Sequence, residues 1–388
     1  MLVDVFTYLT MFFISTFFFY IVELQYKLSG EKRSRIQVIA ASIIAVIIPC
    51  LFAAFRADTV GADTCGYPVE HMKIARACGS IKELFGVIDF EAEYSYGLLV
   101  YLSSRITSNS AILLFWFQML TIVPIYRAAL KMKDKVSVAC CMLVYFLMFY
   151  NNSFNMMRQS VACAFVLYGI IRIITEKKIS IRTCFILLFA ITFHKSGIIS
   201  LIGIILVLGI NKINRLVVKI ALFVTLCFLP LIINIVFNFL LYKGVLPIKY
   251  IAYGDIFLLN KYHTDWLINP FNIYSMTFVF ILITVLMISL FARKYSINRN
   301  ECVFSKLNTI NICGLLIYLS ILFGLKTMYG IRFSTSYDFF YIISLPGVLP
   351  GKNNKFKTAV LISLLTVFWF IWIFINGWSA SANYRLRF

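Results

Sequence analysis

The chain has 388 residues, of which 61% are hydrophobic and only 13% are charged, and its mean hydropathy is +0.89. Apolar runs of about 15 to 25 residues recur along nearly the whole length, and a helix needs roughly 20 apolar residues to cross a bilayer. This composition excludes a water-soluble protein and predicts an all-α, polytopic integral membrane protein. No stretch is long and polar enough for a separate soluble domain, so we expect a single integral membrane domain over residues 1–388.

The net charge of +20 does not indicate nucleic-acid binding, because the Lys and Arg residues cluster in short loops between apolar runs. By the positive-inside rule such loops face the cytoplasm and its anionic lipid. The basic clusters lie at residues 27–35, 127–135, 172–182, 212–219, 293–306 and 352–357. We therefore expect contact with membrane lipid and no nucleic-acid partner.

The first apolar run, residues 5–22, has no basic stretch before it and no small-residue cleavage site after it. We predict a retained helix rather than a signal peptide, with the N-terminus outside and residues 36–55 returning to the outer side. The basic loops predict further spans at residues 109–127, 135–151, 155–174, 180–193, 196–210, 216–241, 271–292, 306–325, 333–350 and 357–376. Together these make roughly 12 transmembrane helices.

Two longer loops, residues 56–93 and 242–270, are then extracytoplasmic. If residues 94–107 also crossed the membrane, the basic loop at 127–135 would lie outside. We therefore predict that residues 94–107 form a re-entrant or interfacial helix. The loop 56–93 carries seven acidic residues, as an outside loop can: Asp58, Asp63, Glu70, Glu83, Asp89, Glu91 and Glu93.

Ionisable side chains at membrane depth are candidates for function, because each is costly unless paired or wetted. The first lies after the second span, where Arg56 is followed by Asp58 and Asp63 in a turn that Gly61 permits. Arg56 can bind an anion while Asp63 orients it or contacts sugar hydroxyls. The alternative is an arginine at a helix end that reaches the surface and pairs with Asp58.

The second candidate is the start of a helix after Asn151, where Arg158 and Gln159 follow a helix-capping Ser153 or Asn155. The helix N-terminus favours a nearby anion, and these two side chains add a charged fork and an amide. The alternative is that Arg158 joins helices through backbone carbonyls.

The third candidate is His194, at a break between two short spans. Histidine exchanges a proton near neutral pH, so it suits acid–base catalysis or the positioning of a hydroxyl. The alternative is an imidazole that bonds a carbonyl freed by the break. His71 and His263 lie in polar loops and are expected to be solvated.

Near the C-terminus, Arg332 and Tyr337 lie five residues apart at a helix start, where they can contact phosphate or sugar or simply anchor the interface. Residues 384–388 are expected to form a polar tail outside. Cys65 and Cys78 share one outer loop and can either pair or remain free thiols. Walker, Rossmann and HExxH patterns and an aspartate-rich pair are absent from the sequence, so we predict neither a metal nor another cofactor.

Four short blocks resemble, in order and spacing, those of the EpsG family of polysaccharide-biosynthesis membrane proteins, which is related to Wzy-type polymerases. The blocks span about residues 50–345, and each pairs an aromatic residue with a polar one. They are Phe55-Arg56 with Gly61, Asp63, Thr64 and Tyr67; Phe154-Asn155 with Arg158, Gln159 and Ala162; Phe193-His194-Lys195-Ser196; and Arg332-Phe333-Ser334 with Tyr337. The chain departs from the family pattern at Ala57, where a glycine is commoner, and at Lys195 beside the histidine.

The resemblance implies a GT-C-like glycosyltransferase in the bacterial inner membrane, with its active site facing the periplasm or exterior. It would join lipid-linked oligosaccharide repeat units into O-antigen, capsule or exopolysaccharide. The growing chain on undecaprenyl diphosphate would be the donor and a hydroxyl of the incoming unit the acceptor. Arginines can stabilise the leaving diphosphate without a metal, and direct displacement would invert the anomeric carbon.

On this basis we assign catalysis to His194, Arg158 and Arg332, and substrate binding to Arg56, Asp63, Tyr67, Gln159 and Tyr337. A chain-length regulator is a further candidate partner. Three other classes remain open: an O-antigen-type ligase, a polysaccharide flippase or other transporter, and a membrane O-acyltransferase.

Overall fold

The structure is a computed structural model of the chain. It describes residues 2–28, 34–64, 66–90, 93–210, 301–324, 329–347, 355–377 and 380–386, with isolated positions between 224 and 287. Two compact units are present: residues 1–198 with 342–388, and residues 199–341. The prediction of one integral membrane domain stays a prediction.

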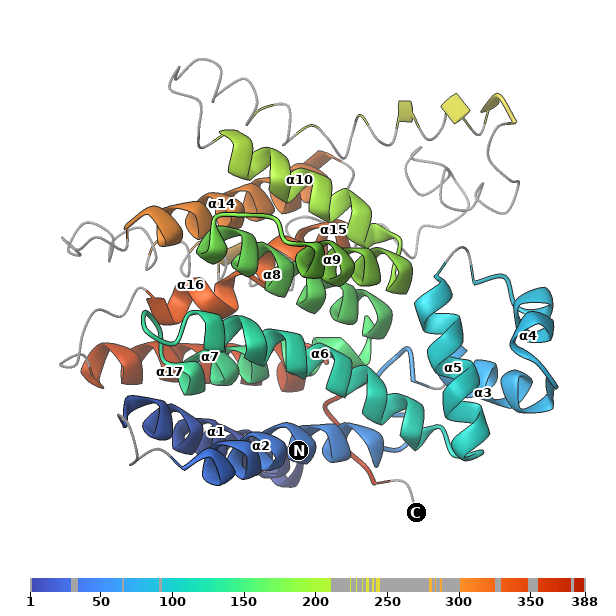
Figure 1. Cartoon of the computed structure of the whole chain (residues 1–388), viewed down its shortest axis with the longest axis horizontal. Helices are drawn as coiled ribbons and strands as arrows, with labels where there is room; N and C mark the ends of the chain where they lie inside the picture. The colour runs from blue at the N-terminus through green and yellow to red at the C-terminus, as the bar shows by residue number, and fades with distance from the viewer. Residues whose placement is uncertain are drawn as a thin grey trace. The chain divides into compact units, whose positions relative to one another are not determined.

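Helices α1 (Leu2–Lys27) and α2 (Arg35–Ala54) form a pair and lie side by side at the start of the chain (Figure 1). Ser34 caps α2 by accepting a hydrogen bond from the backbone N–H of Gln37. Pro49 lies inside α2 and has no N–H for the carbonyl of Ala45. The hydroxyl of Ser15 in α1 donates to that carbonyl at 2.6 Å, so the neighbouring helix supplies the missing donor.

The loop predicted at residues 56–93 contains two short helices, α3 (Tyr67–Ala77) and α4 (Ile81–Val87). They precede α5 (Tyr94–Ile106), which matches the helix expected at residues 94–107. Helix α3 packs on α5, and α4 also contacts it. The predicted loop is therefore a small helical subdomain in its described part rather than an irregular segment.

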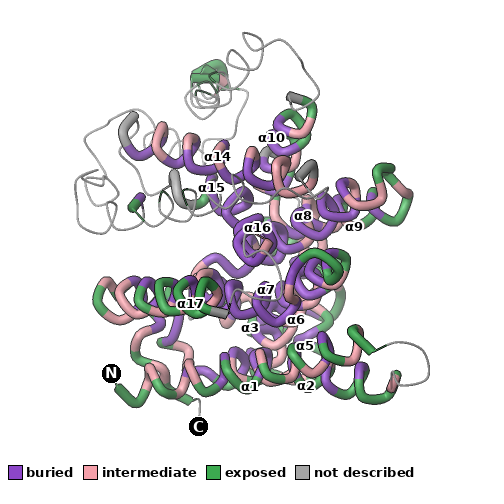
Figure 2. Tube along the Cα trace, turned by 90° about the vertical axis from the view of Figure 1, so that its left-hand side faces the viewer, coloured by how far each residue is buried: buried purple, intermediate pink, exposed green. Residues whose placement is uncertain are grey.

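Helices α6 (Ala111–Lys131), α7 (Val138–Tyr145), α8 (Met157–Glu176) and α9 (Ile181–Phe193) follow. In α8, 83% of the most apolar 18 residues are buried, against 33% in α1, so α8 is a central helix of its unit and α1 a peripheral one (Figure 2). A π-helical turn at Phe146–Tyr150 and a 3-10 turn at Asn152–Phe154 link α7 to α8. This irregular link sets the position at which α8 begins.

A further set of helices lies in the later part of the described chain. It comprises α10 (Ser196–Ile210), α14 (Glu301–Gly324), α15 (Tyr329–Asp338), α16 (Tyr341–Gly347), α17 (Lys355–Phe370) and a π-helical turn at Ile371–Ile375. The single span expected at residues 333–350 is two helices, α15 and α16, separated at residues 339–340. The predicted spans 216–241 and 271–292 and the predicted loop 242–270 lie outside the described residues, apart from isolated positions.

Within the described part of the chain, six helices are long and apolar enough to cross a membrane: α1, α2, α6, α8, residues 303–322 of α14, and residues 356–375. The chain is thus an all-helical, multi-pass membrane protein, as predicted. The expected total of roughly 12 crossings remains a prediction.

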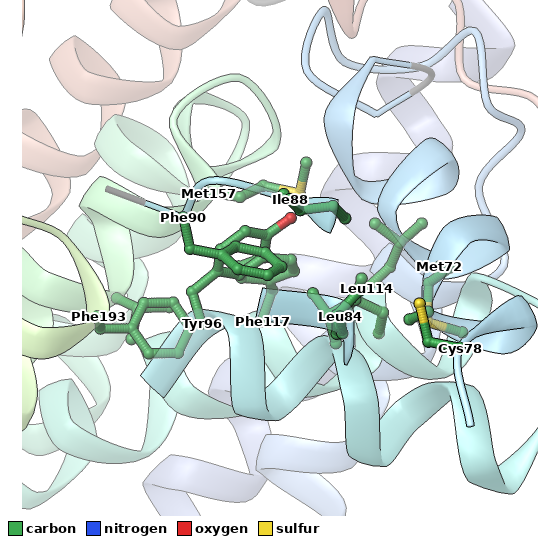
Figure 3. Packing of buried hydrophobic residues seen from close by; sticks show 14 residues of the cluster. Met72, Cys78, Leu84, Ile88, Phe90, Tyr96, Leu114, Phe117, Met157 and Phe193 are labelled. Atoms are coloured by element: carbon green, nitrogen blue, oxygen red, sulfur yellow. The ribbon is translucent and has the colours of Figure 1, made fainter. Parts of the chain in front are cut away.

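A cluster of buried side chains joins α3, α4 and α5 to α6, α8 and the end of α9. Its aromatic part brings together Phe90, Tyr96, Phe117 and Phe193, with Met157 alongside (Figure 3). The rings of Tyr96 and Phe117 are stacked with centroids 5.9 Å apart, and Phe117 meets Phe193 edge-on at 5.9 Å. Because aromatic rings bury large apolar areas, this cluster fixes the start of α5 against α8 and the end of α9.

Candidate functional site

Glu93 is the centre of a buried ion cluster. Its carboxylate is only 2% exposed, and it pairs with two basic side chains that lie far away in the sequence. Oε2 lies 2.5 Å from Nη1 of Arg158, and Oε1 lies 2.5 Å from Nδ1 of His194. Glu93 occupies the N-cap position of α5 but makes no side-chain cap bond there. The carboxylate is therefore committed to the two bases rather than to its own helix.

Arg158 lies in the first turn of α8. A cation at a helix N-terminus is disfavoured by the helix dipole, so the carboxylate of Glu93 offsets an unfavourable local position. Aromatic rings add to this, because the guanidinium carbon lies 4.4 Å from the ring centroid of Tyr67 and 5.1 Å from that of Tyr96. The side chain of Arg158 is still 29% exposed, so it remains accessible from outside the protein.

His194 lies in the break between α9 and α10, in an extended conformation with φ −153° and ψ 123°. Its backbone N–H still bonds the carbonyl of Ala190, and its own carbonyl accepts from Gly197. The break turns the imidazole toward Glu93, and the side chain is 20% exposed. The imidazole therefore bonds a carboxylate, and the alternative of a freed backbone carbonyl does not hold.

The electrostatics keep Glu93 ionised. Burial alone would raise the pKa of its carboxyl, but the hydrogen bond with His194 and the charges of His194 and Arg158 outweigh burial, so the pKa lies below its ordinary value. His71 is different. Burial, helped by the charge of Arg158, lowers its pKa to about 4, and its Nδ1 lies 2.7 Å from the hydroxyl of Tyr96. The expectation of a solvated His71 was wrong, because α3 turns this residue toward α5.

Arg56 is 1% exposed and holds the turn that follows α2. It donates from Nη1 to the carbonyl of Ala53 at 2.5 Å, from Nε to that of Val60 at 3.1 Å, and from Nη2 to Oγ1 of Thr64 at 3.1 Å. A guanidinium at the C-terminal end of α2 also suits the helix dipole. The alternative of an arginine that reaches the surface does not hold, while anion binding by Arg56 stays a prediction.

The Arg56 turn is joined to the ion cluster in two ways. Nη2 of Arg56 contacts the sulfur of Met157, the residue before Arg158, at 3.5 Å. Further along the turn, Asp63 accepts a hydrogen bond from the hydroxyl of Tyr67 at 3.2 Å, and the ring of Tyr67 lies under the Arg158 guanidinium. The first three sequence blocks therefore meet around Glu93.

Residues 380–386 close the Arg56 turn. The N–H of Ala57 donates to the carbonyl of Arg385 at 2.7 Å, and the N–H of Gly61 donates to that of Ala380 at 3.0 Å. The ring of Tyr384 stacks on Phe52 with centroids 4.0 Å apart. The expected polar tail is thus a packed structural segment in its described part.

The chain matches the EpsG family over residues 39–386, which is nearly its whole length. The chain belongs to the EpsG family. Members of this family are similar to Wzy-type polymerases. No curated protein and no solved structure matched the chain.

Family membership indicates a glycosyltransferase-like role in polysaccharide polymerisation. The structure brings His194, Arg158, Tyr67, Asp63 and Arg56 into one region of the first unit. Gln159 follows Arg158 in α8 and is buried. Their roles in catalysis and binding remain predictions.

Arg332 and Tyr337 belong to the other unit, so they are not placed with respect to Glu93. Arg332 is exposed on α15. Tyr337 is 3% exposed and lies against Gly314 of α14, where an added Cβ would come within 2.5 Å of the Tyr337 Cβ. This close approach gives Tyr337 a packing role within its own unit, and its predicted contact with substrate stays a prediction.

Sequence reasoning missed Glu93. It was counted with the other acids of the outer loop, and nothing in its neighbours Asp89 and Glu91 sets it apart. The one available signal was its position directly before the apolar run at 94–107. An acid at the start of a helix that packs into an apolar bundle needs a cationic partner. Of the two cysteines in this loop that could either pair or remain free thiols, Cys78 is a free, buried thiol, and Cys65 lies outside the described residues.

Proposed function

We propose that the protein polymerises lipid-linked oligosaccharide repeat units on the outer side of the bacterial inner membrane. The growing chain on undecaprenyl diphosphate would be transferred to a hydroxyl of the incoming unit. The observation that supports this most is the ion cluster, in which a guanidinium and an imidazole from separate segments share the buried carboxylate of Glu93. Such a pair suits a reaction that releases a diphosphate and takes up one proton.

In the proposed reaction the acceptor oxygen attacks the anomeric carbon of the donor, and the bond from that carbon to the diphosphate oxygen breaks. His194 accepts the proton of the acceptor hydroxyl. Arg158 stabilises the negative charge that develops on the leaving undecaprenyl diphosphate, using N–H donors other than the Nη1 group that faces Glu93. Direct displacement inverts the anomeric carbon, and the charge stabilisation comes from arginine rather than from a metal.

The remaining predicted residues complete this proposal. Arg332 would add a second cation near the diphosphate, and Arg56, Asp63, Tyr67, Gln159 and Tyr337 would bind the sugars or the phosphates. The fold proposed for the whole chain is GT-C-like with roughly 12 crossings, which is the number that the basic loops require.

The exposed face of α5 supports a site at the outer membrane interface. Tyr94, Leu98, Leu102 and Ile106 recur every four residues and are 61%, 45%, 51% and 65% exposed. The helix has 13 residues, or about 20 Å, which is too short to span the bilayer. An apolar stripe on such a helix suits a position in the plane of the interface. Glu93, at the start of this helix, would then lie at the depth where the diphosphate of a lipid-linked substrate sits.

The direct test is elongation by purified protein in proteoliposomes, supplied with lipid-linked repeat units and analysed for chain length. Wild-type protein is expected to produce a ladder of products with undecaprenyl diphosphate released in step. In cells, deletion of the gene should leave single units on the outer side while their synthesis continues. Accumulation of labelled units on the cytoplasmic face would instead identify a flippase, and transfer of intact chains to a different acceptor would identify a ligase.

Topology provides an independent test. Reporter fusions after residue 80 should read extracytoplasmic, and fusions after residues 32 and 178 should read cytoplasmic. A cytoplasmic signal at residue 80 would contradict the proposal, because an outward-flipped substrate could not then reach the loop that contains Asp63.

A further inference from the structure

We propose that Glu93 is a positioning residue, which holds His194 in the tautomer whose Nε2 accepts the proton of the acceptor hydroxyl. This inference rests on the proposed function and assigns a role to a residue outside the four sequence blocks. Its basis is the contact between Oε1 of Glu93 and Nδ1 of His194 at 2.5 Å.

The tautomer follows from the chemistry of the two groups. An ionised carboxylate only accepts hydrogen bonds, so Nδ1 of His194 must donate its proton to Glu93. In a neutral imidazole with a proton on Nδ1, the lone pair lies on Nε2. Glu93 thereby decides which ring nitrogen can act as a base. After proton transfer, the same carboxylate faces the imidazolium and stabilises it.

The surroundings make Glu93 suitable for this task. Its side chain is 2% exposed, and its second oxygen is held by Arg158 at 2.5 Å, so the carboxylate has little freedom to turn. The backbone N–H of Lys195 adds a longer contact to Oε1 at 3.4 Å. The side chain of His194 is 20% exposed, so an acceptor can reach the imidazole ring while Glu93 holds its orientation through Nδ1.

The alternative on the same contacts is a structural role, because Glu93 also connects the start of α5 to Arg158 of α8. A structural clamp of this kind acts through folding, whereas a positioning residue acts through His194. The two roles therefore predict different behaviour when His194 is absent.

The experiment is a double-mutant cycle with Glu93→Gln, His194→Ala and the double variant, measured by initial elongation rates in proteoliposomes. Glu93→Gln should lower kcat by roughly 100-fold, within the range for losing general-base catalysis, while KM for the lipid-linked donor changes little. In the His194→Ala background the same change should cost clearly less than this, because coupled residues are not additive and only the contact of Glu93 with Arg158 then remains to be lost. Losses that multiply in the double variant would overturn the proposal.

A matched control separates positioning from loss of an ion pair. Glu176 also pairs with two basic side chains, Lys131 at 2.7 Å and Arg172 at 3.0 Å, at the far end of α8. Glu176→Gln should leave kcat near the wild-type value. Partial recovery of kcat in Glu93→Asp, which keeps the charge, would also support the proposal, and no recovery would count against it.

Spectroscopy tests the tautomer directly. The chain has three histidines, so the ¹⁵N signals of His194 in labelled protein can be assigned by their loss in His194→Ala. Wild-type protein should show a protonated Nδ1 and an unprotonated Nε2 for this residue, and Glu93→Gln should not keep that preference. A proton on Nε2 in the wild type would overturn the inference. Absence of polymerisation by the wild type would instead refute the proposed function, so the two failures are distinguishable.

Discussion

Gly61→Ala should destabilise the protein through the Arg56 turn. Gly61 has a φ of +90°, and an added Cβ would lie 2.8 Å from the Cβ and the carbonyl oxygen of Phe154 and 2.9 Å from Oγ1 of Thr64. The left-handed backbone costs a residue with a Cβ about 1–2 kcal/mol. Forcing a methyl group against packed atoms adds about 1–3 kcal/mol, because the neighbouring backbone must shift. The expected loss in the free energy of unfolding is therefore about 2–5 kcal/mol.

Two other glycines separate these contributions. Gly377 has a φ of +63° with nothing within 4 Å of an added Cβ, so Gly377→Ala should lose only the backbone part, about 1–2 kcal/mol. Gly86 lies in α4 with open space around it, so Gly86→Ala should be neutral or stabilising by up to about 1 kcal/mol.

The assay is thermal denaturation of the three variants and the wild type in one detergent at one heating rate, because membrane proteins often unfold irreversibly. The expected order of midpoints is Gly61→Ala lowest, then Gly377→Ala, with Gly86→Ala at or above the wild type. If Gly61→Ala and Gly377→Ala melt at the same temperature, Phe154 does not press on the turn and the reasoning is refuted.

Three further results are expected. Arg158→Ala should abolish polymerisation and Arg158→Lys should retain only part of it, because an ammonium lacks the planar fork; normal-length polymer from a well-expressed Arg158→Ala protein would refute the assignment. Ser15→Ala should lower the free energy of unfolding in a denaturation assay by about 1–3 kcal/mol, because the Ala45 carbonyl loses its donor. The control Ser320→Ala should lower it little, because Ser320 bonds a carbonyl of its own helix. The pKa of Glu93 is depressed, so its ionised form stabilises the folded protein above the ordinary carboxyl pKa of about 4.5, and this stabilisation is lost as the pH falls through the lower folded-state pKa. The difference in melting temperature between wild type and Glu93→Gln should therefore shrink as the pH is lowered from about 4.5 toward 3.

The sequence was informative about the long helices. Runs such as 36–55 and 109–127 are found as α2 and α6 within a few residues, because hydropathy over 20 residues is a strong physical signal. The break at His194 was also predicted, from two apolar runs too short to span the membrane with a polar group between them.

Shorter helices were less accessible from the sequence. Residues 67–77 form α3 although their composition is polar, because one face bears Met72 and Ala75 and packs on α5. Such a helix is stabilised by tertiary contact rather than by a long apolar run, and its partner is not visible in the local sequence.

The sequence predicted the basic residues of the candidate site but not its carboxylate. Arg158 and His194 stand out because each interrupts an apolar segment. Glu93 lies among other loop acids and becomes distinctive only once the fold brings it against these two side chains. Arg56 shows the opposite difficulty. It stands out in the sequence, yet in the structure its donors are directed at Ala53, Val60 and Thr64 of its own turn.

The pairing of residues 380–386 with the Arg56 turn has a consequence for biogenesis. Ala57 and Gly61 are made early, but the carbonyls that they bond, those of Arg385 and Ala380, are made more than 300 residues later. At about 5–20 residues per second, the ribosome would take roughly 15 to 65 seconds to reach them. During that interval the turn after the C-terminal end of α2 lacks these partners. The Arg56 turn, which precedes Tyr67 and the ring contact with Arg158, can therefore reach its final form only after residues 380–386 have been synthesised. Premature termination before residue 380 should leave an inserted protein with an incomplete site.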